Sequence, residues 1–268
     1  MLRPITHNNI VYSEISTKEF LLSKVPQITL AFWIIKICST TVGETVADFL
    51  AVNLGLGLGA TSTIMGLLLT ASLVMQFRTK RYTPWIYWLT VVLVSIVGTQ
   101  ITDLLTDKLG ISLYVSTSIF SVLLVAIFTI WYKVEKSLSI HSILTKRREI
   151  FYWATILCTF ALGTAAGDLA TEALGLGFAW GAAIFGGLIA ASYAIYKMGG
   201  NAVATFWAGY ILTRPFGAAM GDLLTQAKQY GGLGLGATWT SVIFLVVIVM
   251  LVTKAQKANN QSVAMLAT

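Results

Sequence analysis

Two stretches of the chain, 120 positions apart, carry the same pattern: AFWIIKICSTTVGETVADFLAVNLGLG at 31–57 and FYWATILCTFALGTAAGDLATEALGLG at 151–177. In both, a tryptophan, a cysteine, a glycine and an aspartate follow one another at equal intervals, and both stretches end in Leu-Gly-Leu-Gly. Agreement at rare residue types over this length indicates that one half of the chain is a copy of the other.

The same pattern, in a shorter form, occurs four times. Each copy has an aspartate, a glycine five positions before it and a tryptophan fifteen positions before it. The aspartates are Asp48, Asp103, Asp168 and Asp222; the glycines are Gly43, Gly98, Gly163 and Gly217; the tryptophans are Trp33, Trp88, Trp153 and Trp207. The chain is therefore predicted to consist of four copies of one unit.

Each unit holds two apolar stretches of the length that crosses a bilayer, roughly 20 residues. The stretches are 27–52, 60–77, 85–108, 112–132, 150–173, 178–196, 202–227 and 237–253. Hydrophobic residues make up 56% of the chain and charged residues 11%, whereas soluble domains carry about 25% charged residues. We predict an all-α polytopic membrane protein whose eight transmembrane helices form four parallel two-helix repeats, in two four-helix halves.

The basic residues predict how these helices are oriented. Of the 18 Lys and Arg, 14 lie in the tails and in alternate loops, and the remaining loops carry only Lys108 and Lys228. By the positive-inside rule, both termini are cytoplasmic. The predicted organisation is a cytoplasmic N-terminal segment (1–26), a first half (27–132), a basic cytoplasmic linker (133–149), a second half (150–253) and a cytoplasmic tail (254–268). Basic residues spread in this way do not form a nucleic-acid surface.

Carboxylates gather at one depth in the membrane. Each unit crosses twice, so the repeated aspartates all lie near the outer ends of the first helices. Glu44, Asp107 and Glu172 each stand four residues from an aspartate, on the same helix face. A carboxylate deep in a span costs about 2.5–3.5 kcal/mol, and crowded carboxylates cannot all stay ionised. Protons or bound cations must therefore compensate them, and these oxygen ligands favour Mg²⁺, Ca²⁺ or Mn²⁺.

The predicted metal ligands are Asp48, Asp103, Asp168, Asp222, Glu44, Asp107 and Glu172. For Asp107 and Glu172, which lie close to loops, contact with headgroups and water stays open. Thr99, Thr164 and Met220 are predicted to line the substrate site, and Met220 would be a ligand only if the helix unwinds there.

Two basic residues inside the spans, Arg214 and Lys36, are predicted to be gating groups or counter-ions. Snorkelling to the cytoplasmic side stays open for Lys36. The repeated glycines are predicted to be packing sites. The repeated tryptophans are predicted to form an aromatic belt at the cytoplasmic interface.

The repeated Trp-x9-Gly-x4-Asp pattern, with Gly167-Asp168-Leu169 and Gly221-Asp222-Leu223, resembles a family of bacterial inner-membrane proteins known as uncharacterised membrane-anchored proteins. This resemblance covers nearly the whole chain and implies a multi-pass protein of the bacterial cytoplasmic membrane. At the level of motifs, the chain is also similar to cation exporters with repeated Glu-x-Gly-Asp motifs, which move Mn²⁺ or Ca²⁺ against protons. Here Ala165 and Ala219 occupy the glutamate position.

From these features we predict a secondary transporter that exports a divalent metal cation in exchange for protons, with Mn²⁺ favoured over Ca²⁺ and Mg²⁺ and with no fixed cofactor. Its partners would be the cation, protons and the lipid bilayer; homo-oligomerisation stays open. Two alternatives remain: a proton-coupled transporter of a small organic solute, and a regulatory membrane protein that transports nothing. An intramembrane aspartyl protease uses a pair of aspartates, which fits four equivalent ones poorly, so no enzymatic activity is expected.

Overall fold

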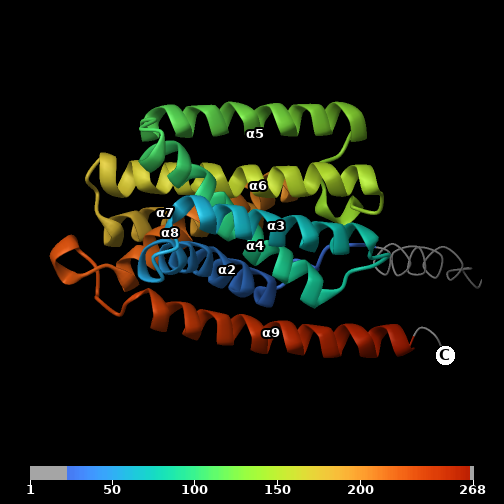
Figure 1. Ribbon diagram of the computed structural model, residues 1–268. Coiled ribbons are helices and arrows are strands. Elements are labelled where there is room, and N and C mark those ends of the chain that lie inside the picture. Colours follow the sequence, from blue (N-terminus) through green and yellow to red (C-terminus); the bar gives the residue numbers. More distant parts are fainter. Residues whose placement is uncertain (1–22, 266–268) are drawn as a thin grey trace, which may run out of the picture.

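The computed structural model of the protein describes residues 23–265, so the predicted segment 1–26 lies outside the described residues except for 23–26. Within this part the chain is all-α and has eight long helices (Figure 1). They are α2 (Leu30–Asp48), α3 (Gly57–Arg78), α4 (Pro84–Asp103), α5 (Leu113–Glu135), α6 (Lys146–Asp168), α7 (Phe178–Lys197), α8 (Ala202–Thr225) and α9 (Ala237–Met265). Each overlaps one of the predicted stretches. Two helices are longer than predicted, because α6 begins within the predicted linker 133–149 and α9 continues through most of the predicted tail 254–268.

Local sequence explains where several helices begin. The side chains of Thr29, Thr145 and Asn201 accept hydrogen bonds from backbone N–H groups in the first turns of α2, α6 and α8. Such N-caps satisfy donors that have no partner within the helix. In the repeated Leu-Gly-Leu-Gly turn before α7, Gly175 and Gly177 have φ of 69° and 74°, a conformation that favours glycine.

The eight helices form two layers around one axis. The first helices of the units, α2, α4, α6 and α8, make a closed inner ring in which each packs on the next and α8 packs on α2. The second helices form the outer layer: α3 packs on α4, α5 on α6, α7 on α8 and α9 on α2. Each outer helix therefore covers the inner helix of the following unit, and the arrangement has pseudo-fourfold symmetry.

The repeated glycines are the crossing points of the inner ring. A Cβ atom built on each glycine would lie far too close to the Cβ of the residue that precedes the next unit's aspartate by eight positions. These distances are 2.5 Å (Gly43 to Ser95), 2.6 Å (Gly98 to Phe160), 2.5 Å (Gly163 to Arg214) and 2.5 Å (Gly217 to Thr40). The same contact recurs at all four crossings and confirms the predicted packing role of the glycines. At two crossings a second contact lies four residues further on in both helices, Gly167 with Ala218 and Gly221 with Glu44, as parallel helices require.

Helix length and hydropathy define a multi-pass membrane protein. In residues 23–265, seven of the helical segments are long and apolar enough to cross a membrane. The exception is α8, which carries Arg214 and Asp222 and lies in the inner ring, covered by α7. The outer layer exposes large apolar side chains such as Leu67, Val122 and Trp180, as a lipid-facing surface requires.

Both ends of the described chain lie at the end of the bundle opposite the aspartates. Tyr82, in the α3–α4 loop, donates its N–H to the carbonyl of Ser23 (2.8 Å), and Asn259 of α9 donates to the carbonyl of Tyr82 (3.3 Å). A buried ion pair between Lys24 Nζ and Glu149 Oε2 (2.6 Å) ties the start of α6 to the segment before α2. The order of helices and loops fits the predicted common side for both termini.

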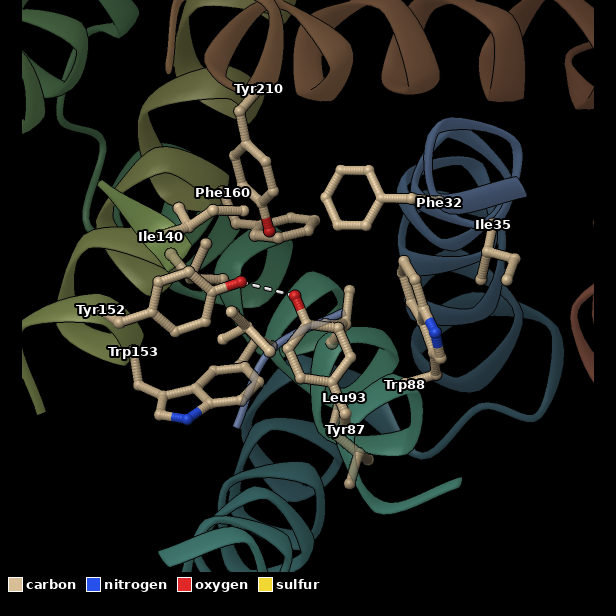
Figure 2. Packing of buried hydrophobic residues seen from close by; sticks show 14 of the residues in the cluster. Phe32, Ile35, Tyr87, Trp88, Leu93, Ile140, Tyr152, Trp153, Phe160 and Tyr210 are labelled. Carbon is tan, nitrogen blue, oxygen red and sulfur yellow. Dashed lines mark hydrogen bonds between the residues drawn. The ribbon is translucent and has the colours of Figure 1, made fainter. Parts of the chain in front are cut away.

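The predicted aromatic belt is wrong for three of the repeated tryptophans. Trp88, Trp153 and Trp207 are 2–4% exposed and lie in the core, where their rings pack against tyrosines of the inner helices. Figure 2 shows Trp88 and Trp153 within this cluster. The indole N–H of Trp207 donates to the carbonyl of Leu138 (2.9 Å). The three buried rings pack against aromatic residues of neighbouring helices, Phe32 on Trp88, Tyr87 on Trp153 and Trp131 on Trp207. Of the four tryptophans only Trp33 is partly exposed.

Candidate functional site

The axis of the inner ring is built from layers of four side chains, one from each inner helix. Steps of four back from the aspartates follow one row of neighbouring side chains along each helix, and contacts across the axis, such as that of Tyr87 with Tyr152, connect these rows. The aspartate layer is Asp48, Asp103, Asp168 and Asp222; the Glu44 layer is Glu44, Thr99, Thr164 and Ala218; the Arg214 layer is Thr40, Ser95, Phe160 and Arg214; the Lys36 layer is Lys36, Val91, Ile156 and Tyr210; the aromatic layer is Phe32, Tyr87, Tyr152 and Phe206. All members below the aspartate layer are buried.

Arg214 is completely buried and reaches from its own layer into the Glu44 layer. Its Nη2 donates to Glu44 Oε2 (2.6 Å), to Thr164 Oγ1 (2.7 Å) and to Thr99 Oγ1, and its Nη1 donates to the carbonyl of Thr40 (3.1 Å). These oxygens, from α2, α4 and α6, are called the Arg214 seat below. The seat joins three predicted site residues, Glu44, Thr99 and Thr164, to a fourth, Arg214.

Lys36 lies one layer further from the aspartates and is 1% exposed, so it does not snorkel. Its Nζ stands 3.9 Å from the ring centroid of Phe160 and 4.3 Å from that of Tyr210. Within residues 23–265 this nitrogen has no hydrogen-bond partner, and it lies within electrostatic reach of Arg214. Two ring faces therefore take the place of an acidic partner.

The aspartate layer lies at the more open end of the ring. Asp222 is buried, the other three aspartates are half-buried, and Asp107 and Glu172 are exposed. Carboxylates from different helices stand within electrostatic reach of one another. Asp168 interacts with Glu44, Asp222, Glu172 and Asp103, and Asp48 interacts with Glu44, Glu172 and Asp107.

This proximity does not amount to a coordination shell. Among the described residues, no three His, Cys, Asp or Glu side chains stand close enough to hold a metal ion. Met220, two residues before Asp222, lies outside the layers, and α8 is continuous there, so the unwinding that a Met220 ligand needs does not occur.

Three of the four aspartates are followed by an irregular turn that the sequence did not reveal. After Asp48, Asp103 and Asp168 the chain continues as π-helix, over Phe49–Asn53, Leu104–Lys108 and Leu169–Ala173. After Asp222, α8 instead ends at Thr225. Such wide turns occur often at functional sites, and here two of them carry Asp107 and Glu172.

Sequence reasoning also missed the middle of the axis. Phe160 and Tyr210 hold Lys36, and the hydroxyls of Tyr87 and Tyr152 hydrogen-bond to each other in the aromatic layer (Figure 2). The signal was available, because these residues continue the four-residue series that begins at each aspartate.

The architecture defines a polytopic membrane protein built from four two-helix repeats around one axis. A family model described as "Repeat of Unknown Function (DUF347)" matches four times, at residues 31–82, 86–137, 151–199 and 205–256, and the chain therefore belongs to this family. Each match takes in one inner helix and one outer helix, which confirms the predicted repeat. Comparison with curated proteins gave no match, and neither did comparison with solved structures.

Proposed function

We propose that the protein is a secondary transporter that exports a divalent metal cation, with Mn²⁺ as the first candidate, in exchange for protons across the bacterial cytoplasmic membrane. The observation that carries the proposal is the aspartate layer, in which parallel inner helices bring four carboxylates to one level.

The charge balance of this end favours cations. Seven carboxylates gather there, and Arg214 is the basic group that pairs with one of them, Glu44. The remaining negative charge needs protons or bound cations, because carboxylates at this depth repel one another. Carboxylate and hydroxyl oxygens are hard ligands that suit Mn²⁺, Mg²⁺ and Ca²⁺. Metal and protons compete for the same oxygens, so binding of one releases the other.

In this conformation the axis of the inner ring is more accessible from the aspartate end than from the opposite end. The Arg214, Lys36 and aromatic layers are buried throughout, whereas most of the aspartate layer is half-exposed. Because the carboxylates stand too far apart to coordinate an ion, the metal-bound state requires the inner helices to approach at this end. A rocking movement of one four-helix half against the other would bring them together and open the opposite side.

The test is flux into proteoliposomes. Uptake of Mn²⁺, Ca²⁺ and Mg²⁺ is measured with internal pH recorded, for the wild type, for Asp48→Asn/Asp168→Asn, and for Glu135→Gln as a matched control. Glu135 lies at the far end of α5, paired with Arg148 (2.7 Å). Flux with opposing proton movement, lost in the double variant and kept in the control, supports the proposal. A folded wild type that moves none of these ions excludes it.

One observation favours a second candidate, a proton-coupled transporter of a small organic solute. The absence of a coordination cluster from the described residues is what a carrier whose aspartates bind only protons would show. In the same vesicles, this candidate predicts proton movement that depends on an added solute and that is unaffected by divalent ions.

A further inference from the structure

The Arg214 seat has the chemistry of a cation site. Its oxygens come from a carboxylate, two hydroxyls and a backbone carbonyl, and all of them point at one positively charged nitrogen or its neighbour. Hydroxyl and carbonyl oxygens with one carboxylate are ligands of hard cations. In this structure the cation that these oxygens bind is the guanidinium group of Arg214.

Pseudo-fourfold symmetry shows how this occupant arises. In the Glu44 layer three units supply an oxygen-bearing side chain, and the fourth supplies Ala218. In the Arg214 layer the same fourth unit carries the arginine, where the others have Thr40, Ser95 and Phe160. Three units therefore build the seat, and the fourth unit fills it with a tethered guanidinium.

We infer that the Arg214 seat is a binding site for a small singly charged cation such as Na⁺, K⁺ or ammonium, and that Arg214 is its displaceable occupant. Only Glu44 supplies a negative charge there. A divalent ion would leave uncompensated charge in a buried layer beside Lys36, which is costly. The role of the site within a transport cycle rests on the proposed function; the binding itself does not.

A cation in the aspartate layer has a direct route to the Arg214 seat. The aspartate layer lies one helical turn from Glu44, about 6 Å along the axis. Asp48 and Glu44 stand on one face of α2. A cation passing from the aspartate layer meets Glu44 first and competes with the guanidinium for the same Oε2. Arg214 thereby closes the axis whenever the seat holds no other cation.

The test uses full-length Arg214→Ala purified in detergent. Its thermal unfolding is followed in Na⁺, K⁺, ammonium, guanidinium or Mn²⁺ chloride at low millimolar concentration, with choline chloride matching the ionic strength. We expect Na⁺, K⁺ or ammonium at these concentrations to raise the Tm of the variant by several degrees. The wild type, in which the cation must first displace Arg214, should respond only at much higher concentrations of the same salt. Glu44→Gln/Arg214→Ala, which lacks the seat's charge, is expected to lose the effect.

Several outcomes overturn the inference: stabilisation by guanidinium alone, by Mn²⁺ alone, equal stabilisation of the double variant, or none by any salt. Guanidinium alone would mark a purely structural arginine. Should Arg214→Ala fail to fold, Arg214→Met, which retains more of the volume, is purified in each salt; failure in all of them counts against the inference. The flux test of the proposed transporter uses variants that retain Arg214. The proposed transport function and the proposed cation site at the seat can therefore fail independently of each other.

Discussion

Replacing Gly98 by alanine tests the crossing on which the ring depends. A Cβ at this position would lie 2.6 Å from Phe160 Cβ and 3.3 Å from the backbone nitrogen of Ala161. Carbon atoms are normally in contact at about 3.5 Å, so α4 and α6 would have to separate by roughly 1 Å. Neither neighbour is the end of a flexible side chain, so the helices themselves must move.

The expected cost follows from two opposed effects. Overpacking a tight core costs about 1–3 kcal/mol, and replacing glycine by alanine within a helix returns about 0.5–1 kcal/mol. We therefore expect Gly98→Ala to lower the free energy of unfolding by about 1–2 kcal/mol. At Gly187, on the outer helix α7, no described atom lies within 4 Å of the built Cβ apart from the chain neighbours and the helix's own backbone. Gly187→Ala should leave stability unchanged or raise it.

Equilibrium unfolding by SDS in mixed micelles measures both variants against the wild type. If Gly98→Ala proves as stable as Gly187→Ala, the close approach of α4 and α6 is wrong, and with it the equivalence of the four crossings.

Three further predictions concern buried charges and topology. Glu149→Gln leaves Lys24 without its acidic partner and should cost about 3 kcal/mol in the same assay; a loss below about 1 kcal/mol would contradict this. Lys36→Met removes an amine that has no acidic partner in the described chain and should keep or raise stability; a marked loss would mean that its contacts with the rings stabilise the fold. In a cysteine-free background, Asn201→Cys should react with an impermeant thiol reagent from the cytoplasmic side and Tyr230→Cys from the outside; labelling from one side only would mean that α8 does not cross.

The helices and the repeat could be predicted from the sequence alone because both depend on patterns within short stretches of the chain. Hydrophobic length marks a span wherever it occurs, and glycine and tryptophan at fixed distances from each aspartate mark the unit. The role of the glycines followed for the same reason, since only a residue without a side chain lets two helices approach as α4 and α6 do at Gly98.

The packing of one unit against another could not be predicted from such local patterns. Nothing in one unit says that its outer helix covers the inner helix of the next, or that α9 returns to α2. The inward turn of Trp88 and Trp153 depends on that arrangement, and an interface belt was therefore the wrong expectation.

The candidate site was predicted in composition but not in geometry. Equal depth of the aspartates followed from the even number of spans. Their separation across the axis depends on how closely the inner helices pack, which no local pattern gives, and the structure shows no coordination cluster in residues 23–265. The contact of Arg214 with Glu44 was hidden for another reason, because a long side chain carries its charge into the neighbouring layer.

Equilibrium binding of Mn²⁺ to the purified protein tests most directly whether the aspartate layer acts as one cation site. Free Mn²⁺ is read by electron paramagnetic resonance for the wild type, for each single Asp→Asn variant of the layer, and for Glu135→Gln. The proposal predicts one shared site, weakened by about tenfold or more in each of the four variants, a loss of about 1.4 kcal/mol, and unchanged in the control. A wild type that binds no Mn²⁺, or binding that is indifferent to all four substitutions, would contradict it.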